Sequence, residues 1–387
     1  MRFIGRLGRY WLYSDRLLPA EYPSEDFFEA KQDDISGPAG SFTFDYGPVA
    51  GGLIESVRIR LNTYGEYIRR ATLEPKKIRT VKVTGNVQDA LLGIERVNGN
   101  FAASHAVAFL IALEKASSTV APPAVQLSRV LQIELERIRN HVFVIHRIAE
   151  TAGFSVPAAE LLYIMEKVNR VIGRVFGHRY FYGVNGFKRA TTGGGINLTE
   201  FEQITEEFQE VFRGLLESRI FIDRLQGNGV VTDSRSIGPT ARAAGFEYDA
   251  RLDGDYSTVY AQLGYRLLRH SSPDAFGRLL IRGEEVAQSL ALIRSAVEKR
   301  EEFCDDAKPD DASVEGIGLG RIESPSGDLA YSVNLHDGRL IELSLLPPSV
   351  PNIRLFLESV VSSGFTDVPF NWESFGIWMS EVGVKFV

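Results

Sequence analysis

The stretch Ala124–Thr151, AVQLSRVLQIELERIRNHVFVIHRIAET, indicates the fold most clearly. Its apolar residues recur at three- and four-residue spacing, which predicts one long amphipathic helix. Gly153 follows as a suitable helix stop. Glu134, Arg137 and His141 lie beside the apolar stripe, and we expect an ion pair between Glu134 and Arg137 at the packed boundary. Its simplest role is to orient the helix. The stripe consists of Leu127, Leu131, Leu135, Ile138, Val142, Ile145 and Ala149.

On either side of this helix, the apolar residues in the middle of the chain recur with a helical period. Nearer to both ends of the chain, apolar and polar residues alternate as they do in strands. Residues 42–85 alternate apolar with polar around the turn Tyr64-Gly65, which predicts a small antiparallel sheet. Leu329–Leu335 and Leu340–Leu346 predict a hairpin turning at residues 336–338. We therefore predict an α+β, predominantly helical fold, in which small antiparallel sheet elements lie at the edges of a long-helix core.

The predicted organisation is an N-terminal arm, residues 1–41, followed by a single domain, residues 42–387. Within that domain we expect a small sheet at 42–85, a helical core at 86–303, and an acidic loop, the hairpin and a C-terminal tail at 304–387. The arm carries four arginines among aromatic residues and resembles no secretory signal. It predicts either a basic amphipathic segment that rests on a membrane or a partner, or an ordinary first helix.

The amino-acid composition argues against several classes of function. The chain has 387 residues, 44% of them hydrophobic and 24% charged, which is typical of a globular protein. A formal charge of -7 argues against a nucleic-acid binder, because phosphates require a basic surface. No apolar run is long enough to span a bilayer, the longest being Ala106–Leu113. The single cysteine, Cys304, fits a reducing, cytoplasmic setting and excludes a cysteine-ligated cluster held by this chain alone.

Common chemical motifs do not explain the chain. His141 and His146 are five residues apart, so their rings diverge around a helix, whereas zinc-binding helices use a spacing of four. The loop Thr191–Gly195 forms no phosphate-binding motif and reads as a turn. Cys304 lies in an acidic stretch that would raise its pKa. These residues alone indicate a large helical cytoplasmic protein without a self-sufficient active site.

Taken together, segments from Phe44 to the C-terminus resemble a known family, the large subunit shared by [NiFe] hydrogenases and respiratory complex I. Each segment is short, but all occur in the family's order, and this makes the resemblance specific. The matching segments are Phe44–Pro48, Arg96–Phe101 with Ser104 and His105, Glu134–Ile138 with His141, Gly153, Gly238–Gly245, Asp249 with Arg251, Asp274–Ser289 and Glu323–Leu329. The resemblance implies the hydrogenase-type fold.

Departures from the family pattern bear on the function. In the hydrogenases that the chain resembles, two pairs of cysteine thiolates hold nickel and iron, since these metals favour soft ligands. Here the first pair falls on Asn98 and Phe101, and the second on Trp378 and Glu381. We therefore expect no metal bound by this chain. Complex I relatives bind a quinone headgroup through a histidine and a tyrosine. Those positions hold Val49–Gly51 and Gly99 here, so quinone binding would lack its usual partners.

The resemblance implies a large subunit of a membrane-associated, complex I-like or hydrogenase-related oxidoreductase complex. Its expected partners are a small subunit that carries an iron–sulfur cluster, a complex I-like hydrophilic subunit and membrane subunits that translocate ions, at the cytoplasmic face of the cell membrane. In this hypothesis the chain contributes to electron transfer coupled to ion translocation. The alternatives are a non-catalytic subunit that clamps the small subunit to the membrane arm, and an NADH:quinone oxidoreductase subunit with a degenerate quinone site.

The residues expected at the site fall into two sets. The first set would lie near the acceptor or the partner's cluster, with arginines holding a negative acceptor and Glu134 and His141 passing protons. Each of them is equally well explained as a residue that maintains the fold. The second set marks the positions of the lost metal or quinone site. The first set is Arg96, His105, Glu134, Arg137, His141 and Arg242; the second is Asn98, Gly99, Phe101, Trp378 and Glu381.

Overall fold

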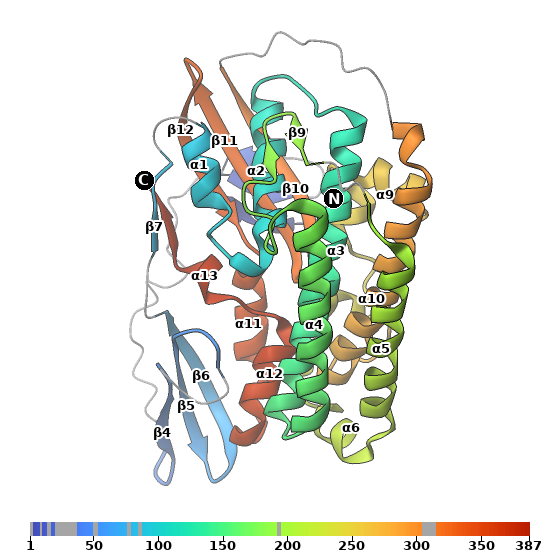
Figure 1. Cartoon of the computed structure of the whole chain (residues 1–387). Helices are drawn as coiled ribbons and strands as arrows, with labels where there is room; N and C mark the ends of the chain where they lie inside the picture. Colours follow the sequence, from blue (N-terminus) through green and yellow to red (C-terminus); the bar gives the residue numbers. More distant parts are fainter. Residues whose placement is uncertain are drawn as a thin grey trace.

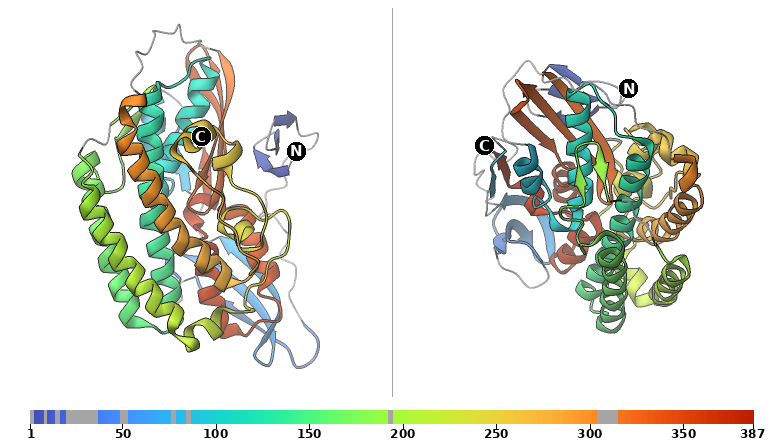
Figure 2. Two further views of the ribbon diagram at one scale, coloured as in Figure 1. Left: turned by 90° about the vertical axis from the view of Figure 1, so that its right-hand side faces the viewer. Right: turned by 45° about the horizontal axis from the view of Figure 1, so that its top comes forward.

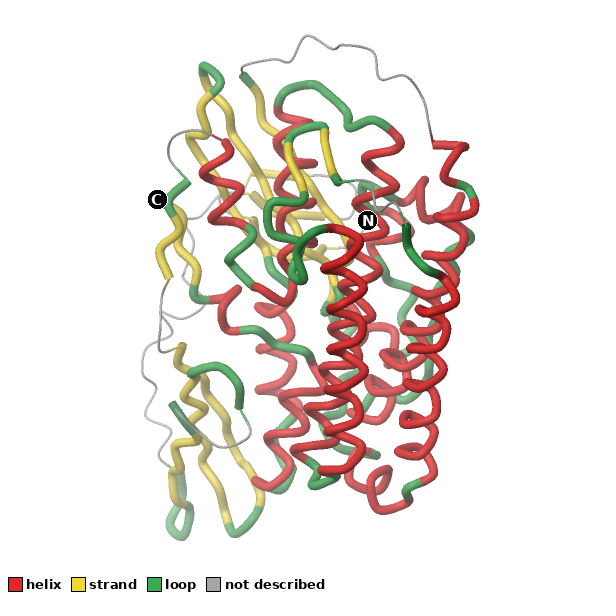
Figure 3. The backbone as a smooth tube through the Cα atoms, in the orientation of Figure 1, coloured by secondary structure: helices red, strands yellow, loops and turns green. Residues whose placement is uncertain are grey.

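Long helices stand side by side in one half of the molecule, and small sheets lie along the other half (Figure 1, Figure 3). The structure is a computed structural model that describes residues 3–7, 10–13, 17–19, 37–48, 53–75, 79–83, 87–191, 195–303 and 315–387. Cys304, the residues 49–51, the centre of the loop 191–195 and most of the acidic segment lie outside the described residues. The mostly helical prediction with small sheets is confirmed.

The helices account for about half of the described residues. Three short 3₁₀ turns accompany them at Gly99–Phe101, Arg300–Phe303 and Phe365–Asp367. Within the described ranges, no helix combines the length and the apolar character that crossing a bilayer requires. The α-helices are α1 (Val87–Ile94), α2 (Ala102–Ala116), α3 (Pro123–Thr151), α4 (Ser155–Phe176), α5 (Leu198–Glu217), α6 (Arg219–Leu225), α7 (Gly238–Ala243), α8 (Ala250–Asp253), α9 (Ser257–Leu263), α10 (Ala275–Glu298), α11 (Ser349–Ser359), α12 (Val368–Phe375) and α13 (Met379–Val382).

Helix α3 confirms the prediction made from its sequence. It begins at Pro123, a residue suited to the first turn because it lacks an N–H, and ends before Gly153, whose φ is +92°. The expected ion pair between Glu134 and Arg137 is present at 3.2 Å. Its expected position at the boundary is wrong, since both side chains are buried. Tyr260 of α9 and Ser289 of α10 donate to Glu134, and Arg137 donates to backbone carbonyls of β10.

The strands form several small sheets. β4, β5 and β6 form an antiparallel sheet, and β5 and β6 join at the turn after Tyr64, which confirms the predicted sheet up to Pro75. β7 is different, because it pairs in parallel with β13 at the C-terminus. The strands are β1 (Phe3–Leu7), β2 (Tyr10–Tyr13), β3 (Leu17–Pro19), β4 (Phe42–Tyr46), β5 (Val57–Tyr64), β6 (Tyr67–Pro75), β7 (Arg79–Val81), β8 (Asn185–Gly186), β9 (Arg189–Ala190), β10 (Gly316–Ser324), β11 (Gly327–His336), β12 (Arg339–Leu346) and β13 (Val384–Phe386).

The predicted hairpin is confirmed as β11 and β12. Asp337 and Gly338 join them with φ angles of +49° and +69°, as a tight hairpin turn requires. A third strand, β10, pairs with β11 and lies ahead of the hairpin, where the sequence predicted only an acidic loop. Its glycines hide the strand pattern, because glycine is depleted in strands.

The N-terminal arm contains strands. β1, β2 and β3 form a small antiparallel sheet that stands beside β11 and β12, as Figure 2 shows. Leu12 is buried there and packs with Ala330 and Leu346. The alternative of an ordinary first helix is therefore wrong.

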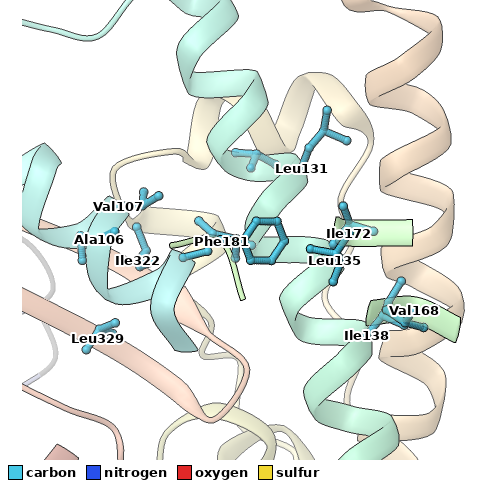
Figure 4. Close-up of a cluster of buried hydrophobic side chains, with 14 of the residues drawn as sticks. Ala106, Val107, Leu131, Leu135, Ile138, Val168, Ile172, Phe181, Ile322 and Leu329 are labelled. Atoms are coloured by element: carbon cyan, nitrogen blue, oxygen red, sulfur yellow. The ribbon is translucent and has the colours of Figure 1, made fainter. Parts of the chain in front are cut away.

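The main hydrophobic core lies between the long helices and the sheet β10–β12. Figure 4 shows side chains from α2, α3, α4, β10 and β11 gathered in one cluster with Phe181 among them. Because α3 contacts helices on several sides, even its polar residues must find partners inside the protein. This packing positions the site residues described below.

Candidate functional site

An open cavity of about 540 Å³ lies where the segment after α1 meets the segment before α13. It brings together Arg96, Asn98, Gly99 and Trp378, four of the residues that the sequence singled out. Strand β7 and the segment that follows α4 complete its wall. The lining residues are Ile54, Glu55, Arg79, Arg96, Val97, Asn98, Gly99, Asn100, Tyr182, Trp378 and Ser380.

Two arginines line this cavity with exposed side chains. The Nη1 group of Arg96 donates a hydrogen bond to the carbonyl of Leu92 at 2.6 Å. The Arg96 guanidinium also stacks over the ring of Tyr182, with its carbon 5.1 Å from the ring centroid. Arg79 donates from its Nη1 group to the carbonyl of Arg96. Backbone acceptors and an aromatic ring therefore hold both guanidiniums in place and leave most of their N–H groups available.

A buried carboxylate, Glu381, lies behind the cavity wall. Its Oε1 atom accepts from Asn98 Nδ2 at 2.9 Å and lies 3.3 Å from His105 Nε2. Its Oε2 atom accepts from Ser349 Oγ at 2.6 Å. His105 Nδ1 lies 2.7 Å from the hydroxyl oxygen of Tyr331. These contacts give every ring nitrogen and carboxylate oxygen a partner, so the group is a satisfied polar cluster.

The four positions at which the resemblance places thiolates meet in space. Phe101 and Trp378 contact each other edge to face, with ring centroids 5.9 Å apart. Phe143 stacks on the other side of Trp378, also at 5.9 Å. Asn98 and Glu381 are joined by the hydrogen bond described above. Aromatic rings and a hydrogen-bonded amide and carboxylate therefore fill the inner part of this site.

Sequence reasoning missed Glu55, Arg79 and Tyr182. Glu55 accepts hydrogen bonds from the backbone N–H groups of Met379 and Ser380 and thereby caps the start of α13. Burial raises the pKa of Glu55 above its ordinary value. These three residues come from segments far apart in the chain and belong to no motif. Only the tertiary fold places them at one cavity.

The remaining candidates, Glu134, Arg137, His141 and Arg242, belong to a second cluster. We call this cluster the buried charge network. Four arginines and four carboxylates balance each other in it, and every member is almost completely buried. Its residues are Glu134, Arg137, His141, Arg242, Asp249, Arg251, Arg282, Glu285 and Glu323.

Arg242 is the most connected member of the network. It lies 2.6 Å from Asp249, 2.8 Å from Glu285 and 2.7 Å from Glu323. Arg251 approaches Asp249 and Glu285, each at 2.7 Å. Such buried pairs are tolerated because each charge has close partners that replace water. Helices α3, α7, α8 and α10 and strand β10 each supply at least one member.

Charges in the network shift the pKa values of its acids in opposite directions. Burial disfavours the ionised form of Glu285, but the guanidiniums of Arg242 and Arg251 outweigh it and hold the pKa of Glu285 well below its ordinary value. Burial, together with the neighbouring Asp249, raises the pKa of Glu323 to about 7. Glu323 is therefore the network's carboxyl group that is best suited to exchange a proton near neutral pH.

A solved structure shares the fold of this chain. The chain superposes on a chain of a solved structure described as the membrane-bound sulfane sulfur reductase, an archaeal respiratory membrane complex, with a TM-score of 0.79. The superposition covers 89% of this chain and 98% of the other at 18% sequence identity. At this identity the likeness establishes a shared fold.

Sequence comparisons show similarity to one family over part of the chain. The model of the respiratory-chain NADH dehydrogenase 49 Kd subunit matches residues 148–315. The carbon monoxide-induced hydrogenase of Rhodospirillum rubrum is 24% identical over 306 residues, which cover 75% of this chain and 84% of that protein. An NADH-quinone oxidoreductase subunit of Solibacter usitatus is 26% identical over 290 residues, which cover 70% of this chain and 76% of that protein. Over these stretches the chain is similar to the large-subunit family that hydrogenases share with respiratory complex I.

Proposed function

We propose that this chain is the large subunit of a membrane-associated, complex I-like respiratory oxidoreductase that works without a nickel–iron centre. In this proposal it packs against a small subunit with an iron–sulfur cluster and against membrane subunits that translocate ions, at the cytoplasmic face of the membrane. Electrons from the cluster reach an acceptor in the open cavity. The similarity to the large-subunit family supports the general role. The fold that this chain shares with a chain of a respiratory membrane complex agrees with it.

The observation that carries this proposal is the combination of a filled inner site with an open cavity beside it. Asn98, Phe101, Trp378 and Glu381 present an amide, two aromatic rings and a carboxylate, and this set does not fit nickel or iron, which need thiolates in such a site. The cavity of about 540 Å³ remains accessible and mostly polar. An accessible polar cavity favours a redox role over a purely structural one.

Affinity purification tests the general role. A tagged copy of the chain is purified from detergent-solubilised native membranes, and peptide mass spectrometry identifies its partners. We expect a small iron–sulfur subunit and polytopic, antiporter-like subunits. Recovery of the chain alone, or only with soluble proteins, would contradict the proposal. Elemental analysis of the same preparation should detect iron from the partner and no stoichiometric nickel.

The aromatic filling by Phe101, Phe143 and Trp378 also favours a second candidate, a non-catalytic clamp. The variant Ser380→Trp separates the two candidates, because it fills the cavity while Ser380→Ala leaves it open. If an acceptor binds there, Ser380→Trp slows the decay of the reduced cluster's EPR signal in membrane vesicles by about tenfold or more, at unchanged yield of the complex. Equal rates in both variants would support the clamp.

A further inference from the structure

We propose that the open cavity is an anion-binding site in which Arg79, Arg96 and the hydroxyl group of Tyr182 bind the ligand. This inference rests on the proposed function, because the anion would be the electron acceptor of the complex. It goes further by naming the chemical class of that acceptor as a small anion rather than a neutral, lipid-like molecule.

The first argument is charge. Two guanidiniums, those of Arg79 and Arg96, line one cavity, and no ion pair in the described part of the chain involves either of them. Exposed arginines elsewhere do pair with acids, as Arg174 does with Glu200 at 2.5 Å. The cavity therefore concentrates positive charge on a chain whose formal charge is -7. Guanidinium groups form strong, charge-assisted hydrogen bonds with oxyanions.

The second argument is hydrogen bonding. The hydroxyl oxygen of Tyr182 lies 2.9 Å from where a side chain at Gly99 would begin, so the absence of a side chain at position 99 gives this hydroxyl its space. Within the described chain it makes no hydrogen bond, although Tyr182 lines the cavity. Its ring stacks under Arg96, which places a neutral donor next to a cationic one.

Glu55 is the one acid among the described residues of the cavity wall, and it does not cancel this charge. Its carboxylate oxygens accept the backbone N–H groups of Met379 and Ser380, so its negative charge is directed at the start of α13. Burial raises the pKa of Glu55 above its ordinary value, and the hydrogen bonds from Ser380 and Met379 partly offset this shift. Among the lining residues, the two guanidiniums therefore outnumber the single carboxyl group.

The lining argues against a neutral apolar ligand. Sites for apolar molecules are predominantly hydrophobic and aromatic. Here Ile54, Val97 and Trp378 are the apolar side chains, whereas seven of the eleven lining residues are polar or charged. The volume of about 540 Å³ accommodates a dianion the size of thiosulfate with ordered water around it.

Binding of thiosulfate and of sulfate to the purified full chain tests the inference by titration calorimetry at low salt. We expect thiosulfate to bind, and Arg79→Gln and Arg96→Gln each to weaken its affinity by about tenfold or more. Tyr182→Phe should weaken binding by a smaller factor. Affinity should also fall as the salt concentration rises. Arg174→Gln is the matched control, because it removes an exposed arginine outside the cavity, and it should leave binding unchanged.

Several results would overturn the inference. These are no binding of either anion, equal affinity in the arginine variants and the wild type, or tight binding of a short-chain ubiquinone that the arginine variants do not alter. If Arg96→Gln melts at a lower temperature than the wild type, the affinities of Arg96→Lys and Arg79→Gln for thiosulfate are measured in its place. Binding by the chain but not by the purified complex would assign the arginines to contacts with a partner subunit. Anion binding is measured without turnover. The anion-binding proposal can therefore fail while the partner subunits are still recovered and the proposed function stands.

Discussion

His141 is a neutral base inside a network of fixed charges. Its Nε2 atom lies 2.7 Å from Glu285, and its Nδ1 atom lies 3.2 Å from Nη1 of Arg282. Arg282 can only donate, so Nδ1 accepts and Nε2–H donates to Glu285. The pKa of His141 is lowered from 6.5 to about 3, mainly by burial; Glu285 opposes this shift, and Arg282 and Arg137 add to it. At neutral pH the histidine is therefore an orienting group with one fixed tautomer.

This pKa shift predicts a pH dependence of stability. The unfolded chain protonates this histidine below pH 6.5, whereas the folded chain resists protonation down to about pH 3. Stability is therefore lost as the pH falls, by about 2 kcal/mol between pH 7 and 5 from this group. His141→Gln keeps a donor for Glu285 and removes the titration. Urea unfolding at both pH values should show a smaller acid loss in the variant, by about that amount, and parallel losses would contradict the assignment.

At the scale of elements, β10 lies so close to α2 that side chains are excluded between them. A Cβ atom at Gly320 would lie 2.0 Å from the carbonyl oxygen of Ala108, and one at Gly318 would lie 1.9 Å from that of Ala112. These glycines hide the strand pattern of β10 in the sequence, although they are what the packing requires. The long helix α3 was predictable, because its period is visible in consecutive residues. The cavity was only partly predictable, since Arg79 and Tyr182 reach it through pairing and packing that no local pattern encodes.

The close approach of β10 to α2 predicts the effect of added methyl groups. Gly320→Ala forces the strand and helix apart and should lower the free energy of unfolding by about 1–3 kcal/mol. Gly214→Ala is the matched control, since Gly214 lies in α5, is exposed and has nothing within 4 Å of its Cβ position. It should raise the free energy by up to about 1 kcal/mol through helix propensity. Chemical denaturation of both variants measures the difference, and two equal effects would contradict the packing argument.

For the whole molecule, the buried charge network joins parts of the chain that are distant in sequence. Glu285 of α10 contacts His141 of α3 at 2.7 Å, Arg242 of α7 at 2.8 Å and Arg251 of α8 at 2.7 Å. Arg242 in turn contacts Glu323 of β10 at 2.7 Å, so the network extends from the helices to the sheet. It therefore fixes the relative placement of elements that the hydrophobic core alone would constrain less specifically.

The same connectivity predicts that removing one carboxylate destabilises the whole chain. Glu285→Gln leaves Arg242 and Arg251 with one fewer acid, and an uncompensated buried charge costs about 3–5 kcal/mol. The control Glu358→Gln breaks an exposed pair with Arg354 and should change stability by less than about 1 kcal/mol. Calorimetric melting of both variants compares them. A small effect of Glu285→Gln would mean that the remaining acids redistribute around the arginines. Local melting of α10 alone would mean that the network does not couple the helices to the sheet.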